Sequence, residues 1–78
     1  MSIDKKRLFL YFENQLKMNR IKEVLEEKGI KQIWLAEKLG KSYNMVNAYA
    51  QNRQQPRIEI LYKIAEILNV NAKDLLTD

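Results

Sequence analysis

The sequence predicts a small all-α domain, and three features of the chain lead to this prediction. Hydrophobic residues make up 46% of the 78 residues, whereas glycine occurs only twice and proline once. Apolar residues recur in several segments at the i, i+3, i+4 spacing of one helix face. Two of these segments meet at a tight turn within residues 31–56. Since the chain has no cysteine, neither a disulfide nor a thiolate metal site can reinforce its small core, so stability must come from packed helices.

An extension is expected at residues 1–17, ahead of a helical domain at residues 18–78. Leu8, Phe12 and Leu16 have the spacing of a helix face, whereas the run LFLYF also suits a short strand, because aromatic residues fit a pleated surface. In either conformation the extension carries more apolar surface than a solvated tail. We therefore expect it to pack on its own domain or at a dimer interface.

The start of the chain superficially resembles a signal peptide, because Lys5, Lys6 and Arg7 precede this apolar run. The run is too short for that purpose, and Glu13 interrupts it at once. No stretch approaches the roughly 20 apolar residues that cross a bilayer. We therefore expect a cytoplasmic protein without a membrane partner.

The first helix of the domain is expected at about residues 19–28, with Ile21, Val24 and Leu25 facing inward. Gly29 should end it, because glycine adopts the left-handed conformation of a helix C-cap without steric cost.

The next two helices are expected at about residues 32–39 and 43–51. Gly40 should end the former, and the Ser42 side chain can cap the latter by accepting a bond from a free backbone N–H. The apolar face of the latter helix consists of Val46, Tyr49 and Ala50. Two helices joined by so short a turn form a helix-turn-helix, whose second helix enters the major groove of DNA.

Residues 51–56 have the composition of a polar loop, and Pro56 opens the approach to a fourth helix. The 3.6-residue period of that helix comes from Ile60, Leu61, Ile64, Ala65 and Leu68. Asn69 can adopt its left-handed cap. Asn71 is a suitable N-cap for a short fifth helix that continues through Leu75 and Leu76.

The ordered apolar and turn residues within residues 19–76 resemble the XRE family, the helix-turn-helix proteins of the phage repressor and Cro type. The matching residues are Gln32, Leu35-Ala36, Leu39-Gly40, Ser42, Val46, Pro56, Leu61, Ile64-Ala65, Leu68, Val70 and Leu75-Leu76. The resemblance implies a five-helix DNA-binding domain, to which this chain adds its N-terminal extension.

The distribution of charge favours an anionic partner. The net charge is +4, and residues 31–57 alone contain five basic residues and one acidic residue, whereas residues 58–78 carry −2. Basic residues that neutralise phosphates supply non-specific affinity and steer association. The alternative is a merely solvated basic face, but the helix-turn-helix pattern favours phosphate contact.

Four residues of the second helix in the motif are candidates for contact with DNA bases: Tyr43, Asn44, Met45 and Asn47. The amide of an asparagine places an acceptor beside a donor, which matches N6 and N7 of adenine. Tyr43 can offer its ring to a thymine methyl or its hydroxyl to a phosphate. Met45 either packs under the preceding helix or touches a thymine methyl. The alternative is that the polar residues simply cover a solvent-facing side.

Seven residues are candidates for contact with phosphates: Lys31, Gln32, Lys41, Ser42, Gln51, Arg53 and Arg57. By the resemblance, Gln32 has the family's position at a helix start, where its amide and the helix N-terminus meet a phosphate. Lys31 replaces a small capping residue, which weakens the cap but adds charge. Asn52 replaces a glycine common in that loop, and asparagine tolerates the positive φ required there.

Trp34 has a position that is usually polar in relatives, and together with Ile33 it adds apolar surface beside Leu35. We expect the extension, through Leu8, Phe9 and Phe12, to cover Trp34 within the chain or from a second chain. The alternative is an exposed tryptophan that rests on the first helix.

The function favoured by these patterns is sequence-specific binding of double-stranded DNA by a homodimeric transcriptional regulator, most simply a repressor. The alternative is an antitoxin or similar module that binds a partner protein such as a toxin and regulates its own operon. An enzyme is not expected, because the chain has no histidine, no cysteine and no glycine-rich phosphate loop. No cofactor or metal is expected either.

Overall fold

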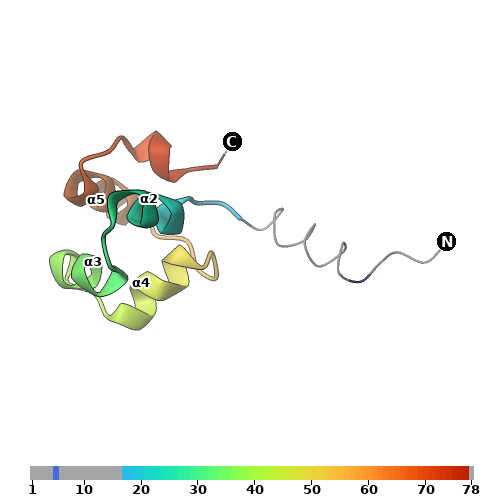
Figure 1. Ribbon diagram of the computed structural model, residues 1–78, viewed down its shortest axis with the longest axis horizontal. Coiled ribbons are helices and arrows are strands. Elements are labelled where there is room, and N and C mark those ends of the chain that lie inside the picture. The colour runs from blue at the N-terminus through green and yellow to red at the C-terminus, as the bar shows by residue number, and fades with distance from the viewer. Residues whose placement is uncertain (1–4, 6–16, 78) are drawn as a thin grey trace.

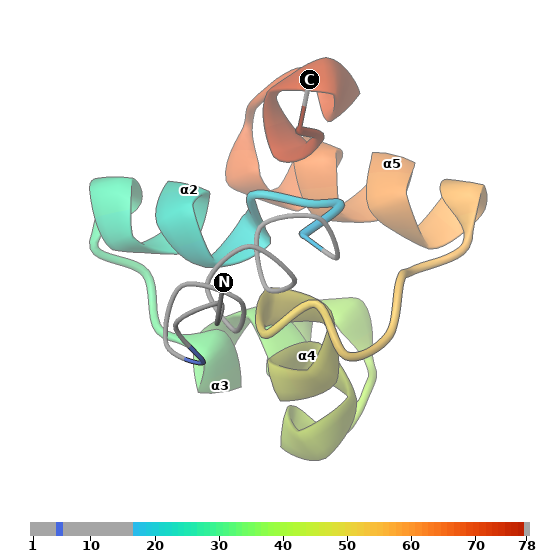
Figure 2. The same cartoon turned by 90° about the vertical axis from the view of Figure 1, so that its right-hand side faces the viewer.

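The computed structural model describes Lys5 and residues 17–77, in which helices make up the regular structure. The α-helices are α2 (Ile21–Lys28), α3 (Gln32–Leu39), α4 (Tyr43–Ala50) and α5 (Ile58–Leu68), and a 3-10 helix, η1, spans Ala72–Leu75. α2, α5 and η1 lie above α3 and α4 in Figure 2. The described residues contain no strand, and the all-α prediction is confirmed for them.

The helix ends carry the caps expected from the sequence. Gly29 and Gly40 end α2 and α3 with φ of 65° and 71°. Asn69 ends α5 in the same left-handed conformation, with φ of 56°. At the start of α4, Ser42 Oγ accepts a hydrogen bond from the Met45 N–H at 3.1 Å. The turn chemistry therefore fixes the lengths of these helices.

Three helix boundaries differ from the sequence predictions. α2 begins at Ile21 and not near residue 19, because Asn19 pairs with Leu76 in an isolated antiparallel bridge. α4 ends at Ala50, and Gln51 is its C-cap. The expected fifth helix is the 3-10 helix η1, and Leu76 is already extended. The count of five α-helices is therefore not confirmed, and the predicted conformation of the extension falls on residues 1–4 and 6–16, which lie outside the described residues.

The apolar faces of the helices meet in one core. Fully buried side chains come from each element: Ile21, Leu35, Val46, Ile64 and Leu75. α3 packs against α4 and α5, α5 packs against η1, and α2 packs against α4. Burial of each such side chain stabilises the fold by roughly 1.5–3 kcal/mol. The two helices of the motif are thus held in place by α2 and α5.

The segment before α2 lies antiparallel to the segment after η1, as the light-blue and red ends of the domain show (Figure 1). The Arg20 N–H donates to the Leu75 carbonyl at 2.8 Å, and the Thr77 N–H donates to the Met18 carbonyl at 3.3 Å. The Thr77 hydroxyl also donates to the Lys17 carbonyl at 3.1 Å. The two ends of residues 17–77 are therefore fixed to each other.

None of the helices in the described part of the chain is long and apolar enough to cross a membrane.

Candidate nucleic-acid interface

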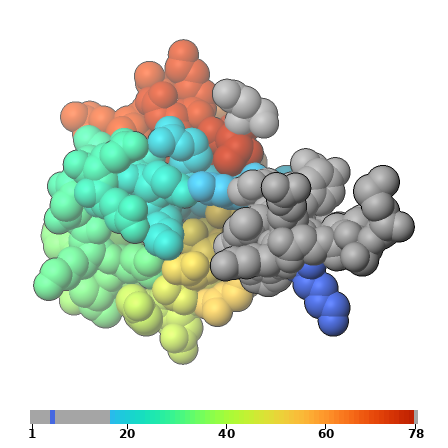
Figure 3. Space-filling model, turned by 45° about the vertical axis from the view of Figure 1, so that its right-hand side comes forward, coloured from blue at the N-terminus to red at the C-terminus, as the bar shows by residue number. Residues whose placement is uncertain are grey.

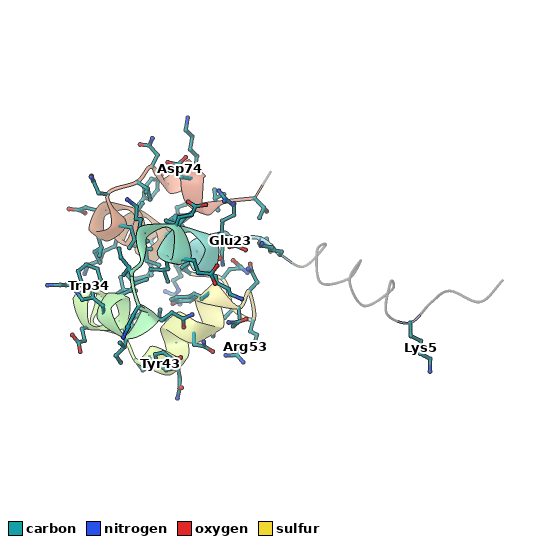
Figure 4. All side chains as sticks on the ribbon, in the orientation of Figure 1. Lys5, Glu23, Trp34, Tyr43, Arg53 and Asp74 are labelled. Atoms are coloured by element: carbon teal, nitrogen blue, oxygen red, sulfur yellow. The ribbon has the colours of Figure 1, made fainter. Side chains whose placement is uncertain are left out.

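The first turn of α4 presents two of the predicted base-reading side chains to solvent. Tyr43 is 47% exposed, and Asn44 beside it is exposed as well. Tyr43 lies at the lower edge of the molecule in Figure 4, at the opposite end from Asp74. Met45 is half-buried and packs against the core, and the rest of its side chain is open to solvent.

Asn47 is the predicted base-reading residue with the most contacts inside the protein. It is half-buried, and its Nδ2 donates to Gln32 Oε1 at 2.9 Å. Its Oδ1 accepts a hydrogen bond from Arg53 Nη2 at 2.7 Å. The structure therefore brings together one predicted base-reading residue and two predicted phosphate-binding residues.

The other predicted phosphate-binding residues come before and after α4 in the sequence. Within the described residues, no hydrogen bond joins their side chains to one another. Lys31 is exposed at the N-cap of α3 and makes no side-chain cap bond, in agreement with the weakened cap expected there. Lys41 is half-buried, and the exposed Ser42 follows it in the turn. Ser42 uses its oxygen as a cap and still has a hydroxyl hydrogen to donate. Gln51 and Arg57 are exposed after α4.

Both ion pairs found among the described residues lie around α2 and not around α4. They join Lys17 to Glu23 and Arg20 to Glu27. Within the same part of the chain, no carboxylate pairs with the basic residues near α4, which are Lys31, Lys41, Arg53 and Arg57. Their charge therefore remains available to an anionic partner.

The pKa of Glu23, which pairs with Lys17, is lowered from its ordinary value. Burial acts in the opposite direction and raises the pKa, because it disfavours the charged carboxylate. The hydrogen bond from Lys17, a backbone hydrogen bond and the charges of Lys17 and Arg20 together outweigh burial. The Glu23 carboxylate is therefore stabilised in the folded state.

A hydrogen-bond network holds the loop after α4, and sequence reasoning missed it. Asn19 is only 1% exposed, and its Nδ2 donates to the Tyr49 carbonyl at 3.0 Å and to Gln55 Oε1 at 2.8 Å. Asn52 Oδ1 accepts from the N–H groups of Met18 and Asn19, both at 2.8 Å. Asn52 Nδ2 donates in return to the Asn19 carbonyl at 3.1 Å. The loop is thereby tied to the segment that enters α2.

The Asn52 backbone has a φ of 59°, so the prediction of a positive φ at this position is confirmed. Its side chain adds bonds that a glycine could not make. Figure 3 shows the result at the surface, where the loop in yellow lies directly against the light-blue segment before α2. Because these partners are 33 residues apart in sequence, no local pattern could have revealed them.

The apolar pair on α3 remains partly open to solvent. Ile33 is 50% exposed and Trp34 is 40% exposed. Lys38 Nζ lies 5.5 Å from the centroid of the Trp34 ring, within the range of a cation–π contact. The extension that was expected to cover Trp34 lies outside the described residues.

Comparison with known proteins identifies the same motif. The model of the helix-turn-helix family matches residues 21–75. A crystal structure described as that of a "putative DNA-binding protein from Bacteroides fragilis" is similar, with 45% sequence identity and a TM-score of 0.75. The similarity covers 78% of this chain and 100% of that chain. No curated protein gives a significant match. Since the family match spans well over half of the sequence, the chain belongs to the helix-turn-helix family of the XRE type.

Proposed function

We propose that the protein binds specific sequences of double-stranded DNA as a transcriptional regulator, with α4 in the major groove. An α-helix with its side chains is about 10–12 Å across, which fits a major groove about 12 Å wide. The observation that carries the proposal is the exposed first turn of α4, where Tyr43 and Asn44 are preceded by Lys41 and followed by Arg53. Polar edges can there face bases while cations on both sides face phosphates.

The proposed contacts divide into two sets. The residues facing bases are Tyr43, Asn44, Met45 and Asn47. The residues facing phosphates are Lys31, Gln32, Lys41, Ser42, Gln51, Arg53 and Arg57. We propose repression as the mode of regulation, since occupation of an operator excludes other proteins from the same DNA and needs no further surface. The relative from Bacteroides fragilis, described as DNA-binding, supports the proposal.

A matched pair of variants tests the proposal after bound sequences have been selected from a random duplex pool. Asn44→Ala should lose about 1–3 kcal/mol on the preferred duplex and little on random DNA, because it removes a contact to a base edge. Arg57→Ala should weaken binding to both and reduce the salt slope by about one, because it removes a phosphate contact. Equal losses on both duplexes for Asn44→Ala would remove that residue from the set that faces bases.

We further propose that two copies bind a two-fold site, because one recognition helix covers only a few base pairs. Ile58 and Tyr62 are 56% and 61% exposed and lie one turn apart on α5, so they offer apolar surface for contact between copies. Footprinting should then show half-sites about one helical turn, or roughly 10 base pairs, apart. A single protected half-site, with one chain per duplex in sedimentation, would contradict the dimer.

The exposed pair of Ile33 and Trp34 supports a second candidate function, in which the protein binds a partner such as a toxin and regulates its own operon. Exposed apolar pairs of this kind are suited to protein contacts. Co-expression with the product of the adjacent gene tests this candidate. A stable complex that Trp34→Ala disrupts would support it, and separate elution of the two proteins would exclude that partner.

A further inference from the structure

Three side chains form a hydrogen-bonded chain across the surface proposed to face DNA. Arg53 Nη2 donates to Asn47 Oδ1 at 2.7 Å, and Asn47 Nδ2 donates to Gln32 Oε1 at 2.9 Å. Gln32 is the first residue of α3, Asn47 lies within α4, and Arg53 belongs to the loop after α4. These hydrogen bonds therefore link both helices of the motif to the loop that follows them.

The chemistry of Arg53 fixes the direction of this chain. A guanidinium group has only donors, so the Asn47 atom that faces it must be the amide oxygen. The Asn47 nitrogen then faces Gln32, which must present its own oxygen in return. Without Arg53 an amide could be turned end for end with almost no change in shape. Arg53 thus decides which end of the Asn47 amide is the donor.

Asn47 keeps hydrogen-bonding capacity for a base. An asparagine amide has two donor hydrogens and an oxygen with two lone pairs. The bonds to Gln32 and Arg53 use one hydrogen and one lone pair. The remaining pair is the set that matches N7 and N6 of adenine. An amide turned end for end would place its donor against the donor of adenine. The orientation of Asn47 therefore sets which base edge it can match.

We propose that Arg53 is a specificity-determining residue, which holds the Asn47 amide in the orientation that reads a base, with Gln32 as the second support. This inference rests on the proposed function and adds to the phosphate contact assigned to Arg53. In the free protein the amide is already held at both ends, so less side-chain freedom is lost when DNA binds.

The test compares Arg53→Ala with Arg57→Ala. Arg57 is also exposed and follows Arg53 in the sequence, and within the described residues its side chain makes no hydrogen bond. Affinities are measured on the selected duplex, on its single-base-pair variants and on a random duplex at several salt concentrations. Arg53→Ala should lower the preference for the selected duplex by about fivefold, the lower end of the discrimination of one bidentate contact. Arg57→Ala should weaken all duplexes by the same factor.

Three further measurements connect the effect to the hydrogen bond between Arg53 and Asn47. In an Asn47→Ala background, Arg53→Ala should leave the preference unchanged, because the amide that it orients is gone. In the free protein, the NMR signals of the Asn47 side-chain amide should move in Arg53→Ala and stay in place in Arg57→Ala. Arg53→Lys should restore part of the preference, since lysine is also only a donor.

An unchanged preference in Arg53→Ala, with the wild type still selective, would overturn this inference and leave the proposed function intact. A lowered preference without movement of the Asn47 signals would also overturn it, because the hydrogen bond would then be absent in solution. A wild-type protein without preference for any duplex would overturn the proposed function and this inference together.

Discussion

Replacing Asn52 with glycine separates the two roles of that residue, which are backbone conformation and side-chain bonding. Glycine adopts a φ of 59° without steric cost, so the turn after α4 should be retained. The lost groups are the oxygen, which accepts from the N–H groups of Met18 and Asn19 and from Gln55 Nε2, and the nitrogen, which donates to the Asn19 carbonyl.

The magnitude follows from the burial of these partners. Met18 is 59% exposed, so water can replace its bond, whereas Asn19 is 1% exposed. A buried donor without a partner costs about 1–3 kcal/mol, and the bond to the Asn19 carbonyl is worth about 1 kcal/mol. The greater freedom of glycine in the unfolded chain costs about 0.5–1 kcal/mol, which relief of the left-handed conformation roughly offsets. We expect a loss of about 2–4 kcal/mol in the free energy of unfolding, or about 8–32 °C in Tm.

Thermal and urea unfolding, followed by circular dichroism, measure this loss. Asn69→Gly is the matched control, because Asn69 has a φ of 56° and its side chain makes no hydrogen bond in the described residues. That variant should stay within about 0.5 kcal/mol of the wild type. Asn52→Ala should be less stable than Asn52→Gly, since alanine adds left-handed strain of about 1–2 kcal/mol. An Asn52→Gly protein as stable as the wild type would refute the role assigned to the side chain.

Three other expectations concern the rest of the domain. Because the pKa of Glu23 is lowered in the folded state, its carboxylate contributes fully to the free energy of unfolding above the ordinary glutamate value of 4.5. This contribution is lost as the pH falls through the folded pKa. Glu23→Gln should remove this part of the pH dependence, worth less than about 1 kcal/mol, in urea titrations at several pH values, and an unchanged pH profile would exclude the pairing with Lys17. Leu75→Ala should cost about 2–5 kcal/mol, because the side chain is fully buried, and unchanged stability would separate η1 from the core. Deleting residues 1–16 should lower Tm or the dimer fraction and shift Trp34 fluorescence to the red, whereas an equally stable dimer with weaker DNA binding would show that the basic N-terminus reaches DNA.

The helices and the core could be predicted from the sequence because they depend on neighbours within a few residues. The period of the apolar residues in α5 follows from the geometry of one helix. Gly40 and Ser42 mark a helix end and a helix start through their own backbone and side-chain chemistry. The exposed side of α4, with Tyr43 and Asn44, could be assigned for the same reason.

The contacts between distant segments could not be predicted in this way. The sequence predicts Asn19 inside the first helix, because nothing near it in sequence indicates that it lies beside Leu76 or that the Asn52 side chain bonds to its backbone. The link of Asn47 to Gln32 and Arg53 depends on how α3, α4 and the following loop are packed. Whether the amide of Asn44 or that of Asn47 is hydrogen-bonded within the protein therefore depends on the tertiary structure.

The network around Asn52 also restricts how this protein can change during evolution. Asn19, Asn52 and Gln55 each satisfy polar groups of the others, and Asn19 does so in the interior. A substitution at any one of them leaves the others with unpaired groups, so single steps that do not restore these bonds are disfavoured. Among homologues that share this network, the three positions should therefore be inherited as a unit, even where the neighbouring loop residues drift freely.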